Sequence, residues 1–223
     1  MISIYAGKNG SGKSYNAVKY AVSQMCKGRL VFSDMPIFCT VGNKLIVTAK
    51  LTKSMIRDFD FPEGCLVIIN EADSWFNCRN SREFTVEDLI VFSQSRHIDI
   101  DLVIVAKRFT GVDTNIRSCC DDFCWMTRFP KWQKIRPFFF KLTHYETEED
   151  FLAKVPVEKP TVNYVLFSQK IAQSYDTRYQ RNILHKRPKK NYTFWEMEHY
   201  EPHLSLWQKI KGIHKNLRKG VEK

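Results

Sequence analysis

The chain has 223 residues, of which 43% are hydrophobic and 13% aromatic, and its formal net charge is +11. This composition predicts a sizeable buried core in one large domain, or in one domain with an appendage. No apolar run approaches the ~18 residues of a membrane span, and a strand predicted at the very start leaves no room for a signal peptide. We therefore expect neither an integral membrane protein nor a secreted one.

The cysteines favour a reducing compartment. There are seven, an odd set without a C-x-x-C pair, which is typical of reduced thiols in a cytoplasmic protein. Cys119, Cys120 and Cys124 cluster, but no histidine accompanies them at zinc-finger spacing. We interpret them as ordinary buried cysteines rather than as a zinc site.

The first predicted elements are a strand over Ile2–Ala6 and a helix over Ser14–Met25, joined by a glycine-rich loop. The loop fits G-x-x-x-x-G-K-[ST] without a substitution, and the motif requires this strand–loop–helix context. Its glycines allow the backbone to approach a ligand closely, and the helix N-terminus directs main-chain N–H groups at phosphate oxygens. The nucleotide-binding residues that we predict are Gly7, Lys8, Asn9, Gly10, Ser11, Gly12, Lys13, Ser14 and Tyr15.

Two of these residues have a specific predicted role. Lys13 adds a full positive charge on the outer phosphates, and the Ser14 hydroxyl is placed to ligate Mg²⁺. The expected ligands are therefore ATP and Mg²⁺. The alternative, a glycine-rich turn that binds nothing, is disfavoured because both flanks are correct.

The rest of the chain alternates short apolar runs with helical stretches. Further strands are predicted over Leu30–Phe32, Cys65–Ile69, Asp101–Ala106 and Phe123–Met126, and a loop or hairpin over Phe38–Thr48. Helices are predicted over Lys53–Phe59, Thr85–Arg96 and Asp113–Cys119. The pattern weakens after Phe138, with strand-like Phe138–Leu142 and Thr161–Phe167 around a brief helix over Glu148–Lys154. Such alternation favours an α/β fold with a mainly parallel sheet between two helical layers, a three-layer P-loop NTPase.

A second motif follows the strand that ends at Ile69. Four apolar residues precede Asn70 and Glu71, a pattern similar to the Walker B motif, which ends in Asp-Glu. The carboxyl edge of the sheet would place these side chains beside the phosphates. We predict that Asn70 holds Mg²⁺ through water and that Glu71 activates the attacking water. Either the metal is held more weakly than by an Asp, or Glu71 and Asp73 share the work. The alternative is a buried strand that ends in polar turn residues.

The ordered combination of motifs resembles a known family. Arg96-His97 precedes a strand, Lys107 follows that strand, and Ile116-Arg117 comes shortly after. Together with the glycine loop and Asn70-Glu71, this order resembles the zonula occludens toxin (Zot)-like proteins of filamentous phages. More broadly it resembles the FtsK/HerA superfamily of DNA-pumping ATPases, of the ASCE type with a RecA-like sheet, which includes packaging ATPases of tailless viruses. The resemblance covers Met1 to about Phe123.

The chain departs from that family at two positions. The family usually has Asp where this chain has Asn70, and Gln, a γ-phosphate sensor, where this chain has Lys107. An amide brings no negative charge to the metal, and an ammonium group cannot accept a hydrogen bond from water. Both changes bear on hydrolysis more than on nucleotide binding.

In ring-forming relatives an arginine from the neighbouring subunit completes the site, and its charge stabilises the transferred phosphoryl group. The candidates here are Arg96, Arg108 and Arg117, with Arg79 and Arg82 further back. For each of them a surface salt bridge is the alternative. Arg96 is our first choice because its motif matches the family best, so the predicted catalytic set is Lys13, Glu71, Arg96 and Lys107.

The carboxyl end carries most of the charge. Residues 178–223 hold twelve Lys/Arg against four Asp/Glu, which accounts for eight of the eleven net positive charges. We divide the chain into a P-loop ATPase domain over residues 1–172 and a basic, aromatic-containing C-terminal extension over 173–223. The extension suggests nucleic acid or an anionic membrane surface as a partner, and its last apolar residues, Trp207 to Val221, recur at the spacing of an amphipathic helix. The rings of Tyr192–Met197 either stack on unpaired bases or dock the extension on the ATPase domain.

Taken with the resemblance, these features predict a ring-forming viral ATPase that couples ATP hydrolysis to DNA movement, most simply the genome-packaging motor of a tailless virus. It would act in the host cytoplasm or on the virion, with viral DNA, other copies of the chain, and capsid or membrane assembly proteins as partners. Three alternatives stay open: an extrusion factor of a filamentous phage, a nucleotide-binding scaffold with little hydrolysis, and a small-molecule or nucleotide kinase.

Overall fold

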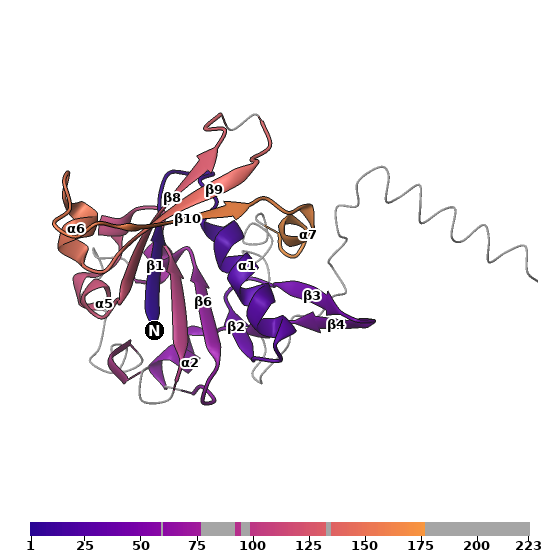
Figure 1. Cartoon of the computed structure of the whole chain (residues 1–223). Helices are drawn as coiled ribbons and strands as arrows, with labels where there is room; N and C mark the ends of the chain where they lie inside the picture. Colours follow the sequence, from indigo (N-terminus) through magenta and orange to yellow (C-terminus); the bar gives the residue numbers. More distant parts are fainter. Residues whose placement is uncertain (59, 77–91, 95–98, 133–134, 177–223) are drawn as a thin grey trace, which may run out of the picture.

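The computed structural model describes residues 1–58, 60–76, 92–94, 99–132 and 135–176 (Figure 1). One large sheet dominates this part of the chain. From one edge to the other its strands are β10 (Thr161–Leu166), β9 (Phe139–Tyr145), β8 (Asp122–Phe129), β1 (Ile2–Ala6), β7 (Asp101–Val105), β6 (Leu66–Asn70), β2 (Val31–Ser33) and β5 (Ala49–Lys50).

The relative direction of the strands divides the sheet into two parts. The strands from β8 to β5 all pair in parallel. β9 and β10 add an antiparallel extension on the β8 side. Within the parallel part, β7 lies between β1 and β6, so the strand before the glycine loop and the strand before Asn70 are separated by one strand. This is the arrangement of the ASCE class that the sequence predicted.

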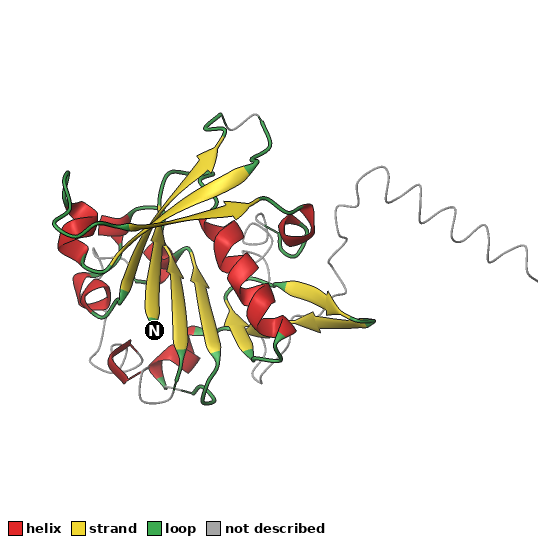
Figure 2. Ribbon diagram, in the orientation of Figure 1, coloured by secondary structure: helices red, strands yellow, loops and turns green. Residues whose placement is uncertain are grey.

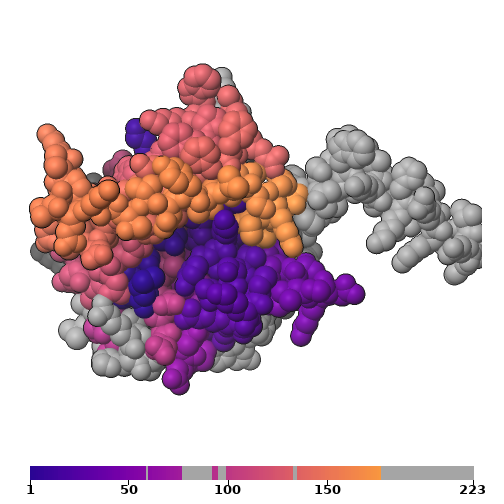
Figure 3. Space-filling view, viewed as in Figure 1, coloured from indigo at the N-terminus to yellow at the C-terminus, as the bar shows by residue number. Residues whose placement is uncertain are grey.

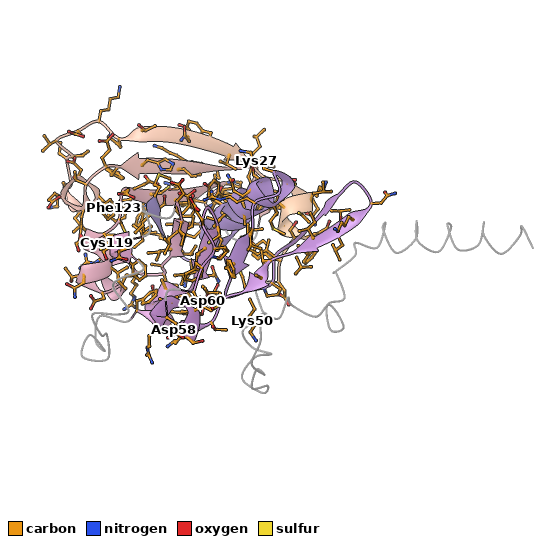
Figure 4. The ribbon with its side chains drawn as sticks, turned by 90° about the horizontal axis from the view of Figure 1, so that it is seen from below. Lys27, Lys50, Asp58, Asp60, Cys119 and Phe123 are labelled. Atoms are coloured by element: carbon orange, nitrogen blue, oxygen red, sulfur yellow. The ribbon has the colours of Figure 1, made fainter. Side chains whose placement is uncertain are left out.

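Helices cover both faces of the sheet (Figure 2). On one face lies α1 (Lys13–Cys26), with the β3–β4 hairpin (Phe38–Val41, Lys44–Val47) and α7 (Gln169–Ala172) beside it. On the other face lie α2 (Lys53–Arg57), α3 (Ala72–Trp75), the 3₁₀ turn η3 (Phe109–Gly111), α5 (Thr114–Ser118) and α6 (Glu148–Leu152). Phe123 and Cys119, both labelled in Figure 4, belong to the cluster on this second face.

β6 shows why the sheet needs both layers. Leu66 and Ile68 pack into the cluster beneath α1, whereas Val67 and Ile69 pack into the cluster on the opposite face. All four side chains are buried completely. A run without polar alternation is stable as a strand only where both faces are covered, so the three-layer α/β prediction is confirmed.

Several boundaries differ from the sequence prediction. The fifth parallel strand was predicted over Phe123–Met126, but β8 continues to Phe129 because β9 pairs with it as far as Phe129↔Phe139. β5 and α3 were not predicted, since two and four residues give no periodicity to detect. The helix predicted over Thr85–Arg96 falls almost entirely outside the described residues.

The described chain ends against the α1 face. Tyr175 forms a β-bridge with Ile37, and the Phe38 N–H donates to the Ser174 carbonyl at 2.9 Å. Contacts with the body therefore continue to Tyr175. The boundary at residues 172 and 173 stays a prediction, because residues 177–223 lie outside the described part. Across the described ranges, no helix has the length and apolar character needed to cross a membrane.

Candidate nucleotide-binding site

Polar residues converge at one edge of the sheet, because parallel strands end there together. The glycine loop follows β1, Asp34 follows β2, Asn70 ends β6 with Glu71 next to it, and Lys107 lies two residues beyond β7. A pocket of about 240 Å³ opens between them. Its lining residues are Asn9, Gly10, Lys13, Ser14, Met35, Asn70, Glu71, Val105, Lys107, Tyr175 and Asp176.

The loop over residues 7–14 is shaped by glycines with positive φ. Gly7, Gly10 and Gly12 have φ values of 147°, 74° and 97°, a region that residues with a Cβ adopt at a cost. Gly12 is also crowded, because a Cβ there would lie 2.3 Å from the ring of Phe140 on β9. The loop therefore rests directly against the antiparallel extension of the sheet.

Lys13 is held by its own loop. Its Nζ donates to the carbonyl oxygens of Gly7 at 2.8 Å and Lys8 at 3.1 Å. Burial lowers the pKa of this ammonium group, and the nearby Lys107 acts in the same direction while Asp73 opposes it. The side chain spans the loop from inside, at the position from which an ammonium group reaches phosphate oxygens.

The structure brings the predicted metal ligands together. The Ser14 hydroxyl donates to Oδ1 of Asn70 at 2.7 Å, which links the first turn of α1 to the end of β6. A hydroxyl and an amide oxygen suit Mg²⁺, which prefers oxygen ligands and retains several waters. The pair alone carries no negative charge, which is unusual for a magnesium site.

Asp34 supplies a carboxyl group that the sequence analysis did not single out. It follows β2 directly, it is only 7% exposed, and its Oδ1 accepts the Asn70 main-chain N–H at 2.9 Å. Its Oδ2 is buried without a hydrogen-bond partner among the described residues. Burial raises the pKa of Asp34 to about 8, and the Glu71 carboxylate acts in the same direction. An orphaned oxygen beside Asn70 fits a site that receives a cation or its water shell.

Glu71 and Lys107 form an ion pair across the pocket. Nζ of Lys107 lies 3.2 Å from Oε1 of Glu71, and Glu71 adopts a left-handed backbone conformation with φ 62°. The Asp73 carboxylate is engaged by the segment after β7: it accepts hydrogen bonds from the main-chain N–H groups of Lys107 and Arg108. Asp73 thus positions the segment that carries Lys107.

The arginine candidates have different environments. Arg96 lies outside the described residues, as do Arg79 and Arg82. Arg108 is exposed, whereas Arg117 is largely buried. The Arg117 guanidinium pairs with Glu148, donates to the Val112 carbonyl and stacks on the Phe109 ring. These contacts occupy Arg117 inside its own chain and make it less suited than Arg108 to reach a neighbouring subunit.

Two tyrosines near the site differ from what the sequence predicted. Tyr15 was predicted to bind nucleotide, but its side chain turns away from the pocket, stacks on Phe167 and accepts the Ser168 N–H at 2.6 Å. Only its main chain remains near the loop, as part of the first turn of α1. Tyr175 lines the pocket from the opposite end of the described chain, and no sequence motif signalled it.

Comparisons with known proteins agree with this geometry. A sequence model of the Zonular occludens toxin (Zot) family matches residues 1–182. The N-terminal domain of zonular occludens toxin from Neisseria meningitidis superimposes with a TM-score of 0.56 at 18% identity, over 78% of this chain and 98% of that one. This likeness confirms the P-loop NTPase fold.

Viral packaging enzymes resemble the chain more loosely. The genome packaging NTPase B204 of Sulfolobus turreted icosahedral virus 2, in complex with ATP-gammaS, gives a TM-score of 0.45 at 14% identity, over 74% of this chain and 95% of that one. B204 described as the DNA-packaging ATPase of Sulfolobus turreted icosahedral virus gives 0.45 at 14% identity, over 74% and 96%. The sequence matches none of the curated proteins with which it was compared.

The contact between Gly12 and Phe140 can be tested by substitution. We expect Gly12→Ala to lower the free energy of unfolding by about 2–5 kcal/mol, from left-handed strain of about 1–2 kcal/mol and overpacking of about 1–3 kcal/mol. In a Phe140→Leu background the overpacking part should disappear. Urea denaturation of the four proteins of this cycle measures the difference.

Gly28 is the matched control for backbone strain alone. Its φ is +83°, and a Cβ there would meet nothing within 4 Å. Gly28→Ala should therefore cost only about 1–2 kcal/mol. An equal cost of Gly12→Ala in both backgrounds would show that Phe140 does not wedge the loop.

Proposed function

Because the chain belongs to the Zonular occludens toxin (Zot) family, we propose that it is an ATPase of virus assembly that couples ATP hydrolysis to the movement of viral DNA. The observation that carries the proposal is the convergence of Lys13, the Ser14–Asn70 pair and Glu71 on one pocket at the carboxyl edge of the sheet. Each of these groups answers one requirement of phosphoryl transfer: phosphate charge, metal placement and activation of water.

In the proposed complex the glycine loop holds the phosphates of ATP. Main-chain N–H groups of the loop and the positive end of α1, which has 14 residues, attract the anion. Lys13 exchanges the carbonyls of Gly7 and Lys8 for phosphate oxygens. Ser14 would hold Mg²⁺ directly and Asn70 and Asp34 would hold its waters, and the bound ion would supply positive charge beside the outer phosphates.

Glu71 is the general base in this proposal. It is placed to take a proton from the attacking water, and in the described structure its carboxylate is engaged by Lys107. An ion pair of this kind occupies an oxygen that the water needs. Lys107 therefore acts both as a phosphate contact and as a restraint on the base.

Assembly into a ring would complete the site with an arginine in trans. Arg96 remains our first candidate from its motif, and Arg108 is the candidate whose exposure favours it. A genome-packaging motor of a tailless virus and an extrusion factor of a filamentous phage use the same chemistry with opposite directions of DNA movement. Membership of the Zot family favours the extrusion factor as the second candidate.

A scaffold that binds nucleotide without turning it over is favoured by one observation, the Lys107–Glu71 pair beside the uncharged Asn70. Steady-state turnover with and without DNA separates the two hypotheses. DNA-stimulated turnover supports the motor, and tight ATP binding without turnover supports the scaffold.

The nucleotide site can be tested at Lys13. We expect Lys13→Ala to weaken ATP binding by about 10- to 150-fold, since a charge-assisted hydrogen bond contributes roughly 1.5–3 kcal/mol. Isothermal titration calorimetry with ATP and Mg²⁺ measures it. Lys27→Ala, an exposed lysine just past the end of α1 (Figure 4), is the control. Unchanged ATP affinity in the Lys13 variant would refute the site.

The role of Asp34 can be tested through the metal dependence of binding. We expect Asp34→Asn to weaken binding of a non-hydrolysable ATP analogue by about 10- to 100-fold when Mg²⁺ is present, as outer-sphere substitutions do. In EDTA the variant and the parent should bind alike. Asp58→Asn, at the end of α2 near the opposite edge of the sheet (Figure 4), should change neither value. A loss of equal size in EDTA would mean that Asp34 only supports the fold.

The restraint on Glu71 predicts a gain of function. We expect Lys107→Gln to raise turnover by a factor of about 1.4 to 5, because an exposed ion pair is worth roughly 0.2–1 kcal/mol and its loss frees the base. Lys107→Arg keeps the pair and should leave turnover near the parent value. A fall in turnover in the Gln variant would show instead that the ammonium group is required on the phosphates.

A further inference from the structure

The antiparallel extension of the sheet has two different faces. Along β9, Phe140 and Leu142 are buried against Tyr15 and the start of α1. Phe139, Lys141 and Thr143 alternate with them and point to the opposite face. That opposite face of β8, β9 and β10 is a candidate surface of its own.

Aromatic rings gather on this face. Phe129 and Phe139 are directly paired across β8 and β9, and their rings are stacked with centroids 4.9 Å apart. Tyr164 on β10 meets the Phe139 ring edge-on at 5.8 Å. We call Phe129, Phe139, Lys141 and Tyr164 the aromatic face.

The aromatic face is open. Tyr164 is 65% exposed and Leu166, on the same side of β10, is 74% exposed, so no described segment covers this end of it. β10 and the β8–β9 hairpin form the upper part of the surface in Figure 3. Phe129 and Phe139 are half-buried and Tyr164 is exposed, so part of this ring cluster is open to solvent, whereas a folded chain normally buries large apolar surface.

The charge around these rings has one sign. From Phe123 to Tyr145 the sequence has five Lys/Arg and no Asp/Glu. Lys141 lies within the face, paired with Thr127 on one side and Tyr164 on the other. Acidic residues lie at the end of the face away from the hairpin: Asp121 and Asp122 at the start of β8, and Glu146 with the first turn of α6 after β9. A polyanion is therefore attracted to the hairpin half of the face.

We propose that the aromatic face binds single-stranded nucleic acid, with bases stacked on Phe139 and Tyr164 and the phosphate backbone near Lys141. Rings can stack only on bases that are unpaired, whereas a duplex keeps its bases inside and offers phosphates alone. The fixed rings match the unpaired bases of a single strand, and the positive charge matches its phosphates. The inference rests on the proposed function, since a protein that moves viral DNA must contact it.

The test distinguishes the contribution of an aromatic ring to binding from that of an apolar side chain without a ring. In the 223-residue chain, Phe139→Leu/Tyr164→Leu keeps apolar area and removes both rings, whereas Phe139→Tyr/Tyr164→Phe keeps both rings. Fluorescence anisotropy with a labelled oligothymidylate of about 30 nucleotides should show about 25-fold or greater weakening for the Leu pair, from roughly 1–3 kcal/mol per ring. The ring-preserving pair should bind like the parent. A duplex of equal length should not distinguish the variants.

A charge variant gives an independent measurement. Lys141→Gln should reduce the slope of log affinity against log salt by about 0.7 for the single strand. Lys53→Gln, an exposed lysine at the start of α2, should not. Equal oligonucleotide affinity of the parent and the Leu pair would overturn the proposal. The proposal would also be overturned if the Leu double variant sedimented differently from the parent but bound the oligonucleotide equally well. The aromatic face would then be a contact with a second copy of the chain.

The outcome is distinguishable from failure of the proposed function. Lys13→Ala should retain oligonucleotide binding while it loses ATP binding, because the rings lie on the face of β9 opposite to the loop. Suppose that DNA does not change the ATP turnover of the parent protein, but that removing both rings weakens its binding of the oligonucleotide. This result would support the single-strand surface and refute the proposed DNA motor.

Discussion

The candidate site depends on one constraint, the parallel alignment of β1, β2, β6 and β7. Parallel strands end at the same edge of the sheet, so the residues that follow them meet although they are far apart in the sequence. Asp34 and Asn70 are joined by a hydrogen bond across 36 positions, and Ser14 and Asn70 across 56. The strands can be aligned in this way because their side chains are apolar on both faces and two helical layers cover them.

Much of this arrangement was predictable from the sequence. The β-branched runs before Asn70 and after Asp101 have no polar alternation, which predicts doubly covered strands and hence a parallel sheet. The glycine spacing specified the loop, and its flanks specified the strand and helix around it. The Ser14–Asn70 contact follows once both strands are placed in one sheet.

Other parts were not predictable, for physical reasons. Asp34 follows a strand of three residues and precedes Met-Pro, so it has the signature of a turn; only its burial next to Asn70 reveals a different role. The full length of β8 depends on pairing with β9, which a local pattern does not contain. Tyr15 follows the motif directly, yet contacts with Phe140 and Phe167 on the extension fix its side chain away from the pocket. The position of Asp34 also bears on Asn70, because the carboxyl group that is missing at the end of β6 is found at the end of the neighbouring strand, hydrogen-bonded to Asn70.

The packing of Phe140 against Gly12 joins two parts of the molecule mechanically. Phe140 touches the glycine loop, while Phe139 and Lys141, its neighbours on the same strand, belong to the other face of β9. Because β9 is paired with both β8 and β10, the residues on its two faces are fixed to one another through the strand. The proposed nucleotide site and the proposed single-strand surface therefore share one strand, and any effect of one ligand on the affinity for the other would be reciprocal.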